Sequence, residues 1–208
     1  MAVELHKGDL RGGIDLGSSV AIDTETMGLN PFRDRLCLVQ LCDSEGHCHL
    51  IQFPPRAEGK PDYSAPNLKA LLADQAITKL FHFARFDVAT LAHHLGVWCE
   101  RVYCTKIASK IARTNADRHG LKDLCRGLLG IEVSKQMQLS DWGREELTPE
   151  QLEYASEDVR HLHELRERLD ELLEREGRAE LAASCFRFVP TRVRLDLAGW
   201  QGVDIFEH

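Results

Sequence analysis

The segment SVAIDTETMGLNP, residues 19–31, places two carboxylates at the end of a predicted buried strand. Asp23 and Glu25 follow three apolar residues directly. Residues two apart in a strand lie on the same side, so these two charges repel each other. An unpaired buried charge costs several kcal/mol, or its pKa shifts until the group is neutral. The segment therefore predicts a cation close to Asp23 and Glu25.

Three further residues could join this pair at one edge of a sheet. Asp87, in HFARFD, falls in the first turn of a predicted helix, and Tyr154 and Asp158 fall in LEYASEDVRHL. Positions i and i+4 share a helix face, with Cβ atoms about 5–6 Å apart. Sets of oxygen ligands suit Mg²⁺ or Mn²⁺. Two such ions can stabilise the attacking and leaving oxygens when a phosphodiester bond is cleaved.

Taken singly, each of these motifs has an ordinary structural explanation. Two acidic residues at a strand end are common, and an Asp in the first turn of a helix usually stabilises the helix dipole. A Tyr and an Asp four residues apart on a helix usually lie at the surface. The three motifs together, in this order and on these elements, favour a metal-binding hydrolytic site.

The elements that must position these groups are short apolar strands followed by mixed helices and strands. The patterns predict strands at 20–25, 36–42, 48–53, 77–83 and near 101–104, a loop at 54–67, and helices at 67–74, 84–97 and 119–130. A long helix should then run to about residue 176. Thr148 is its predicted N-cap, with Pro149 first in the helix, Gln151 completing a capping box and Gly177 ending it. The pattern indicates one mixed α/β domain over residues 1–208.

Composition narrows the class of protein. Lys and Arg number 26 against 33 Asp and Glu, for a net charge of −7, an unusual balance for a protein that grips long nucleic acids. No apolar run is long enough for a transmembrane helix and no signal-peptide pattern is present, so we expect a cytoplasmic protein with no membrane partner. The seven cysteines form no CxxC pair, which favours reduced, buried thiols. His47 and His49 are predicted at the surface.

The three motifs resemble those of a known enzyme superfamily. AIDTET, HFARFD and YASED resemble the exonuclease motifs of the DEDD superfamily of 3′–5′ exonucleases, in its tyrosine subclass. HGLKDLCRGLLGIEVSKQMQLSDW is similar to the segment before the third motif in RNase D. RNase D carries further C-terminal helical domains, for which 208 residues leave no room, so the chain looks most like nanoRNase C. That family is associated with cleavage of very short RNAs.

The resemblance implies a fold and a role for each motif residue. The fold would be an RNase H-like mixed sheet flanked by helices, also described as the DnaQ-like exonuclease fold. Asp23, Glu25, Asp87 and Asp158 would bind two divalent ions, Mg²⁺ or Mn²⁺, with Glu25 also serving the chemistry. Tyr154 would orient the attacking water, since its usual pKa of about 10 makes it a poor base at pH 7.

The resemblance also suggests residues that hold the substrate. Met27, Gly28 and Leu29 follow the first motif, and Leu29 would wedge between the last two bases, although an ordinary turn residue is the other interpretation. His82 would contact the 3′-terminal sugar or else be a core histidine. Candidate phosphate contacts, none of which the sequence can place in the site, are Arg113, Arg118, Arg187, Arg192 and Arg194.

The expected partner is short single-stranded RNA, with dinucleotides preferred, and two rival functions stay open. One is a DNA exonuclease in repair or proofreading, because the predicted machinery need not sense the 2′-OH. The other is a non-catalytic RNase H-like binding module. Residues 181–208 carry many large apolar groups beyond a finished domain, which predicts a homo-oligomer interface. The nanoRNase C resemblance implies an octameric ring.

Overall fold

The strands form one mixed sheet. The computed structural model describes residues 3–56, 61–134 and 136–208, so residues 57–60 of the predicted loop lie outside the described part. The strands of the described chain are β1 (Val3–Lys7), β2 (Ser19–Thr26), β3 (Leu36–Cys42), β4 (Cys48–Gln52), β5 (Thr78–Phe81) and β6 (Val102–Cys104). Their spatial order is β1-β4-β3-β2-β5-β6. Strand β2 lies near the middle, antiparallel to β3 and parallel to β5.

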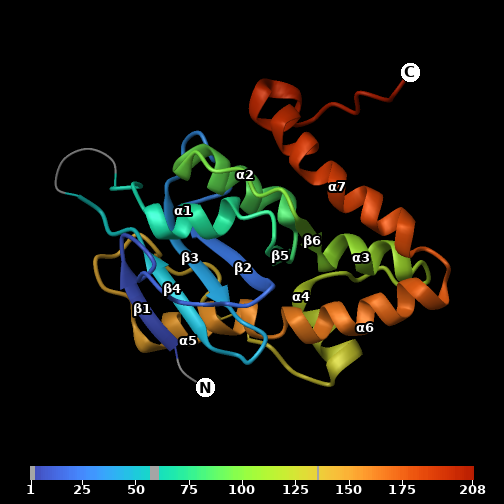
Figure 1. Ribbon diagram of the computed structural model, residues 1–208, viewed down its shortest axis with the longest axis horizontal. Helices are drawn as coiled ribbons and strands as arrows, with labels where there is room; N and C mark the ends of the chain where they lie inside the picture. Colours follow the sequence, from blue (N-terminus) through green and yellow to red (C-terminus); the bar gives the residue numbers. More distant parts are fainter. Residues whose placement is uncertain (1–2, 57–60, 135) are drawn as a thin grey trace.

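Helices cover both faces of this sheet. They are α1 (Pro66–Ala73), α2 (Ala84–Leu95), α3 (Thr105–Ala112), α4 (Leu121–Leu124), α5 (Pro149–Arg160), α6 (Leu162–Arg175) and α7 (Ala179–Leu195), with π-helical turns η1 (Cys125–Leu129) and η2 (Asp196–Trp200). Helices α1 and α2 lie on one side of the sheet and α5 on the other (Figure 1). The predicted RNase H-like mixed sheet flanked by helices is confirmed. Within the described ranges, no helix has the length and apolar character that crossing a membrane requires.

The prediction of one long helix after Thr148 is wrong in one respect, because the structure has two consecutive helices there. His161, with φ −98° and ψ 0°, is the C-terminal cap of α5 and the N-terminal cap of α6, and it separates the two helices. Helix α5 packs on β2, β3 and β4, whereas α6 packs mainly on α3. Each helix buries its own apolar stripe against its own partners. Gly177 ends α6 in the left-handed region, at φ +65°, as the sequence predicts.

Two elements at the ends of the chain are not predicted from the sequence. Strand β1 pairs in parallel with β4 at the sheet edge, and its half-exposed residues lack a strong strand pattern. Helix α7 packs on α2, α3 and β6, and it buries Phe186 and Val189 against its own domain. Arg85 on α2 holds the end of α7 through Asp196, with nitrogen–oxygen distances of 2.5 and 2.8 Å.

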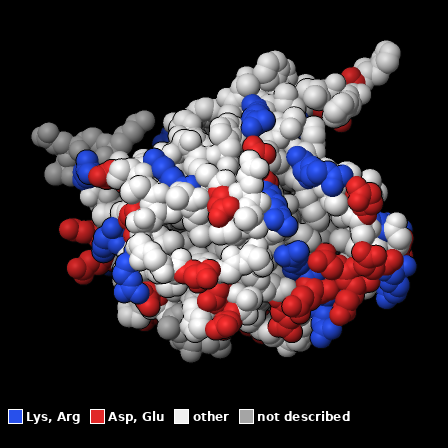
Figure 2. Space-filling model, viewed as in Figure 1, with Lys and Arg blue, Asp and Glu red and all other residues white. Residues whose placement is uncertain are grey.

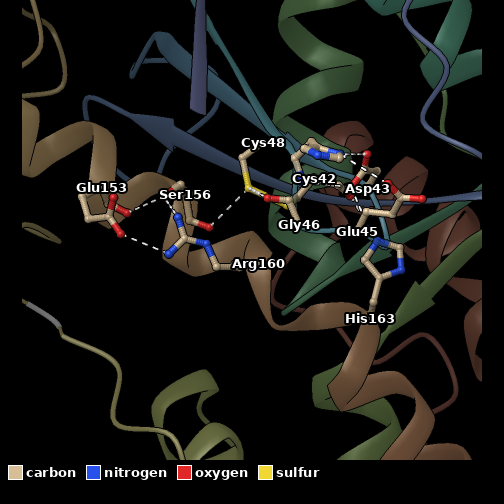
Figure 3. Close-up of a disulfide and its surroundings, with 10 residues drawn as sticks. Cys42, Asp43, Glu45, Gly46, Cys48, Glu153, Ser156, Arg160 and His163 are labelled. Atoms are coloured by element: carbon tan, nitrogen blue, oxygen red, sulfur yellow. Dashed lines mark hydrogen bonds and ion pairs between the residues drawn. A yellow bond between two sulfur atoms is a disulfide. The ribbon is translucent and has the colours of Figure 1, made fainter. Parts of the chain in front are cut away.

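The expectation that all seven cysteines are reduced is wrong for one pair. Cys42 and Cys48 stand opposite each other in the β3–β4 hairpin, with Cα atoms 4.2 Å apart, and form a disulfide (Figure 3). Sequence spacing alone does not show this register, which the turn at residues 43–47 sets. The other five cysteines are free, and four of them are buried. His49, predicted at the surface, is buried in β4, whereas His47 in the turn is exposed.

Candidate active site

The site begins at the end of β2, where alternation directs side chains to two sides of the sheet. Asp23 and Glu25 point to the side that α5 covers, and Thr24 points to the opposite side. The pairing of β2 with β3 shifts register between Glu25 and Thr26. Irregularities of this kind re-aim side chains and are frequent beside active sites. The strand therefore ends by presenting two carboxylates together.

Helix α5 brings the third carboxylate to this pair. Its start is fixed by the predicted capping box: Gln151 N–H donates to Thr148 Oγ1 at 3.3 Å, and Thr148 N–H donates to Gln151 Oε1 at 3.0 Å. Asp158 follows near the end of the same helix. One oxygen each from Asp23, Glu25 and Asp158 lie within 4.8 Å of one another. The structure thus brings together three of the four predicted carboxylates as one group of possible metal ligands.

Asp87, the fourth carboxylate, lies just behind this group. It is 2% exposed, in the first turn of α2, and Thr24 Oγ1 donates a hydrogen bond to its Oδ1 at 2.8 Å. Thr24 stands between Asp23 and Glu25 in β2, so this bond ties Asp87 to the strand that carries both of those carboxylates. Asp87 does not belong to the group of three residues whose carboxylate oxygens lie within 4.8 Å of one another. Its charge nevertheless acts on both Asp23 and Glu25.

Burial and mutual repulsion perturb the acidic groups strongly. Burial is the main cause that raises the pKa of Asp23 well above its usual value, and the charges of Asp87, Asp158 and Glu25 raise it further. The pKa of Glu25 is raised for the same reasons, burial first. Burial also raises the pKa of Asp87 to about 7, against the hydrogen bond from Thr24. Every charge that acts on Asp23 is negative, so the group fits the divalent cations that carboxylate oxygens prefer.

Tyr154 lies one helical turn before Asp158 and is almost fully buried. Its ring packs against Trp142 at 6.0 Å between centroids. Burial raises the pKa of the phenol, and the charges of Asp158 and Glu25 and a hydrogen bond to Asp158 raise it further. Tyr154 therefore keeps its proton at neutral pH and can act as a hydrogen-bonding group, not as a base.

An open cleft of about 630 Å³ lies in front of these residues. Tyr154 and the group of three carboxylates line it, and so do all four predicted substrate residues, Met27, Gly28, Leu29 and His82. Leu29 is 80% exposed at this cleft. A Cβ on Gly28 would collide with the Asp34 carboxylate, so this turn requires glycine. His82 is half-buried, with Nδ1 2.9 Å from Thr105 Oγ1.

The cleft also holds residues that sequence reasoning missed. Phe83 has a left-handed backbone, with φ 75°, which is rare for a bulky residue and typical of functional sites. The Lys106 ammonium lies 4.3 Å from the centroid of its ring. Among the described residues, the cations that line the cleft are Lys106 and Lys122. No periodic pattern marks them, because they reach the cleft only through the packing of α3 and α4.

The arginines suggested as phosphate contacts do not line this cleft. Arg192 binds Asp196 and backbone carbonyls of the C-terminal segment. Arg194 pairs with Glu100 and lies over Trp98, and Arg187 pairs with Glu180. These side chains instead serve the packing and the surface of α7.

The chain is similar to proteins of a known family. The family model described as "3′-5′ exonuclease" matches residues 11–174. The chain belongs to this 3′–5′ exonuclease family. Ribonuclease D of Granulibacter bethesdensis is 33% identical to this protein over 159 residues, which are 76% of its chain. The chain spans about two fifths of the length of the curated relatives that it matches, 38% in this case.

Solved structures agree over the whole chain. The structure "Brucella melitensis NrnC with bound Mg2+" is 49% identical, with a TM-score of 0.92 and full coverage of both chains. The same protein bound to pGG is 51% identical, with a TM-score of 0.92 over 100% of this chain and 99% of the other. The resemblance to RNase D-like exonucleases of the DEDD superfamily, and to nanoRNase C within it, is confirmed.

The raised pKa values predict how stability depends on pH without metal. Because the carboxyl groups have higher pKa values in the folded state, folding binds protons, and this stabilisation is complete only below about pH 4. It declines as pH rises through the folded pKa values, about 7 for Asp87. Asp23→Asn removes one repelling charge. In EDTA at pH 8 the variant should melt several degrees above the wild type. Each kcal/mol gained in the free energy of unfolding raises the melting temperature by about 2–4 °C.

The same comparison at pH 5 and with Mg²⁺ supplies the controls. The difference in melting temperature should shrink at pH 5, which lies below the raised pKa of Asp87, about 7, and where fewer of these carboxyls are charged than at pH 8. Saturating Mg²⁺ should stabilise the wild type more than Asp23→Asn. A variant that melts below the wild type in EDTA at pH 8 would show that Asp23 stabilises the apo fold, contrary to the repulsion described here.

Proposed function

We propose that this protein is a metal-dependent 3′–5′ exoribonuclease that hydrolyses short RNA, with dinucleotides preferred, to nucleoside 5′-monophosphates. The observation that carries the proposal is the convergence of Asp23, Glu25 and Asp158 within 4.8 Å beside Tyr154. Asp87 would complete the ligand set from behind. The ions would be two Mg²⁺ or Mn²⁺; NrnC of Brucella melitensis binds Mg²⁺. When bound, such ions activate the attacking water and stabilise the leaving oxygen.

The protein's own groups would position the reactants. The Tyr154 phenol, protonated and fixed by Trp142 and α5, would hold the attacking water by a hydrogen bond. Glu25 would serve both as a ligand and as an acceptor toward that water. Thr24 would keep Asp87 oriented through the hydrogen bond between their side chains. Groups that only orient the reactants contribute to catalysis without changing their own protonation state.

The residues at the mouth of the cleft would hold the 3′ end of the substrate. Leu29 would wedge between the last two bases, and Met27 and Gly28 would shape the turn that carries it. His82 would contact the terminal sugar. Lys106 would contact a phosphate, because it is one of the two cations that line the cleft in the described part of the chain.

The preference for short substrates is supported by charge and by one relative. NrnC of Brucella melitensis has been solved with pGG, a ligand of two nucleotides. The net charge of this chain is −7. On the face shown in Figure 2, Lys and Arg are scattered among acidic groups and acidic side chains gather over α6. Each phosphate of a longer strand needs a cation to neutralise it, and the face in Figure 2 shows no continuous basic track.

The two rival functions have less support than the proposed one. A DNA exonuclease would use the same carboxylates, but the RNase D relatives and the pGG complex favour RNA. A non-catalytic binding module would not need to retain all four carboxylates and the tyrosine, which this chain does. Assays with RNA and DNA dinucleotides of the same sequence would distinguish the proposed exoribonuclease from a DNA exonuclease.

We further propose that the protein is a homo-oligomer, with the segment 181–208 as an interface and an octamer as the expected assembly. Phe186 and Val189 pack on their own domain, but other apolar side chains of the segment remain exposed. These are Leu181, Phe188, Trp200, Val203, Ile205 and Phe206. Exposed apolar groups clustered in one segment are typical of protein interfaces.

Removing one metal ligand tests the proposed activity. Asp158→Asn keeps the shape of the side chain but removes a charge that a divalent ion requires. It should lower kcat for dinucleotide cleavage by about 10²-fold or more, the scale of a lost transition-state charge contact, with its melting temperature unchanged or raised. Near-wild-type turnover by this variant, or full wild-type activity in excess EDTA, would contradict the proposal.

Removing one hydroxyl tests the role of Tyr154. Tyr154→Phe keeps the ring that packs on Trp142, so the fold should be retained. Because the variant loses the group that orients water, kcat should fall about 10²-fold. Steady-state kinetics together with a thermal melt measure both effects. A lower melting temperature with normal turnover would instead assign Tyr154 to the core.

Substrate length separates a dinucleotidase from a general exonuclease. 5′-Labelled RNAs of two to ten nucleotides should show kcat/KM falling at least tenfold beyond two or three nucleotides. The reason is that each further phosphate needs a cation to neutralise it, whereas the net charge of the chain is −7. A steady rise of kcat/KM toward ten nucleotides would make the protein a general exonuclease while leaving its metal chemistry intact.

Light scattering coupled to gel filtration tests the oligomer. The expected mass at micromolar concentration is a multiple of 23.5 kDa, near eightfold for the octamer. Phe206→Ser should reduce this mass, because it removes an apolar side chain that is 78% exposed. A wild-type mass of one chain would rule the assembly out.

A further inference from the structure

A second group of metal-binding side chains lies at the edge of the sheet, away from the carboxylates of β2. Glu4 and His6 come from β1 and His49 from β4, and Glu4 and His49 are register partners in the parallel pair. Leu50, the next residue of β4, packs in one apolar cluster with Tyr154 on the α5 side. Because neighbouring residues of a strand alternate, His49 faces the other side. The group is therefore separate from the proposed catalytic cleft.

The donor atoms of this group face one another. His6 Nε2 and His49 Nδ1 are 3.1 Å apart, and Glu4 Oε2 lies 4.0 Å from each of them. Ligands about 2.0–2.2 Å from a tetrahedral Zn²⁺ stand roughly 3.3–3.5 Å from each other. Shifts of a few tenths of an ångström would therefore bring all three atoms to bonding distance of one ion.

The surroundings also suit a small cation. The His6 and His49 side chains are only 11% and 9% exposed, so the strands fix both rings, whereas Glu4 is 45% exposed and leaves the group open to solvent. Two ring nitrogens 3.1 Å apart need either a proton or a cation between them.

One neighbouring charge must be considered. Arg11 Nη2 lies 3.6 Å from Glu4 Oε2. The Arg11 side chain is 70% exposed, and ion pairs at the surface contribute little to stability. Arg11 can therefore turn into solvent when Glu4 binds an ion.

We propose that Glu4, His6 and His49 form a Zn²⁺ site that fastens β1 to β4. Two imidazoles and one carboxylate match the ligand types that Zn²⁺ takes in proteins, with a water as fourth ligand. Mg²⁺, which prefers oxygen donors, would favour the carboxylates of the cleft instead. The ion would join β1, at the edge of the sheet that the structure describes, to β4, the strand beside it.

The test is titration of Co²⁺, a spectroscopic substitute for Zn²⁺, with Mg²⁺ kept in excess to occupy the carboxylates. The purified protein should bind one equivalent per chain, with the visible absorption of a four-coordinate nitrogen-ligated ion, and Zn²⁺ should displace it. Asp23→Asn should bind Co²⁺ in the same way, which separates this site from the proposed catalytic one. His47→Ala is the matched control, since His47 is an exposed histidine of the same hairpin.

Two variants decide the outcome. His6→Gln and His49→Gln keep most of the side-chain volume, and each should weaken Co²⁺ binding at least tenfold. Zn²⁺ should raise the melting temperature of the wild type, Asp23→Asn and His47→Ala, but not that of the two Gln variants. Unchanged binding by both Gln variants would overturn the proposal. So would the absence of bound Co²⁺ in the wild type, or its loss in Asp23→Asn alone.

Discussion

The structure depends on holding like charges together at the end of one strand. Asp23 and Glu25 share one side of β2, Asp158 reaches them from α5, and Asp87 stands behind. Burial makes each charged form more costly, and each neighbour adds to that cost. The apo fold must therefore bear a strain that the surrounding packing offsets. The apolar strands β3 and β4, buried on every residue, provide much of that packing.

The rest of the fold can be understood as the means of fixing that group from several directions. Strand β2 sits between β3 and β5, so its position cannot slide without breaking both ladders. The capping box of Thr148 and Gln151 sets where α5 begins, and hence where Tyr154 and Asp158 lie. The turn from β5 into α2, with Phe83 in a left-handed conformation, delivers Asp87. Each contribution comes from a different part of the sequence.

Local signals explain how much of this could be predicted. The strand β3 is a run of apolar residues that only Gln40 interrupts, and the capping box joins Thr148 to Gln151 three residues later, so both were predictable from the residues themselves. The break at His161 was not, because it results from α5 and α6 packing on different partners. The place of Lys106 in the cleft depends on tertiary packing in the same way. The proposed ligand His49 is buried only because β1, whose sequence is a weak strand signal, pairs beside β4.

The mouth of the cleft is lined by several large apolar side chains that are exposed to solvent. Met27, Leu29, Phe83 and Leu139 line it and are all exposed large apolar side chains. Apolar groups contact the faces of nucleobases and make no hydrogen bonds with their edges, and every base has such a face. Binding through this surface would remove apolar area from water and so carry a negative heat-capacity change. A nucleotide bound in this way would be accepted with similar affinity whichever of the four bases it carries.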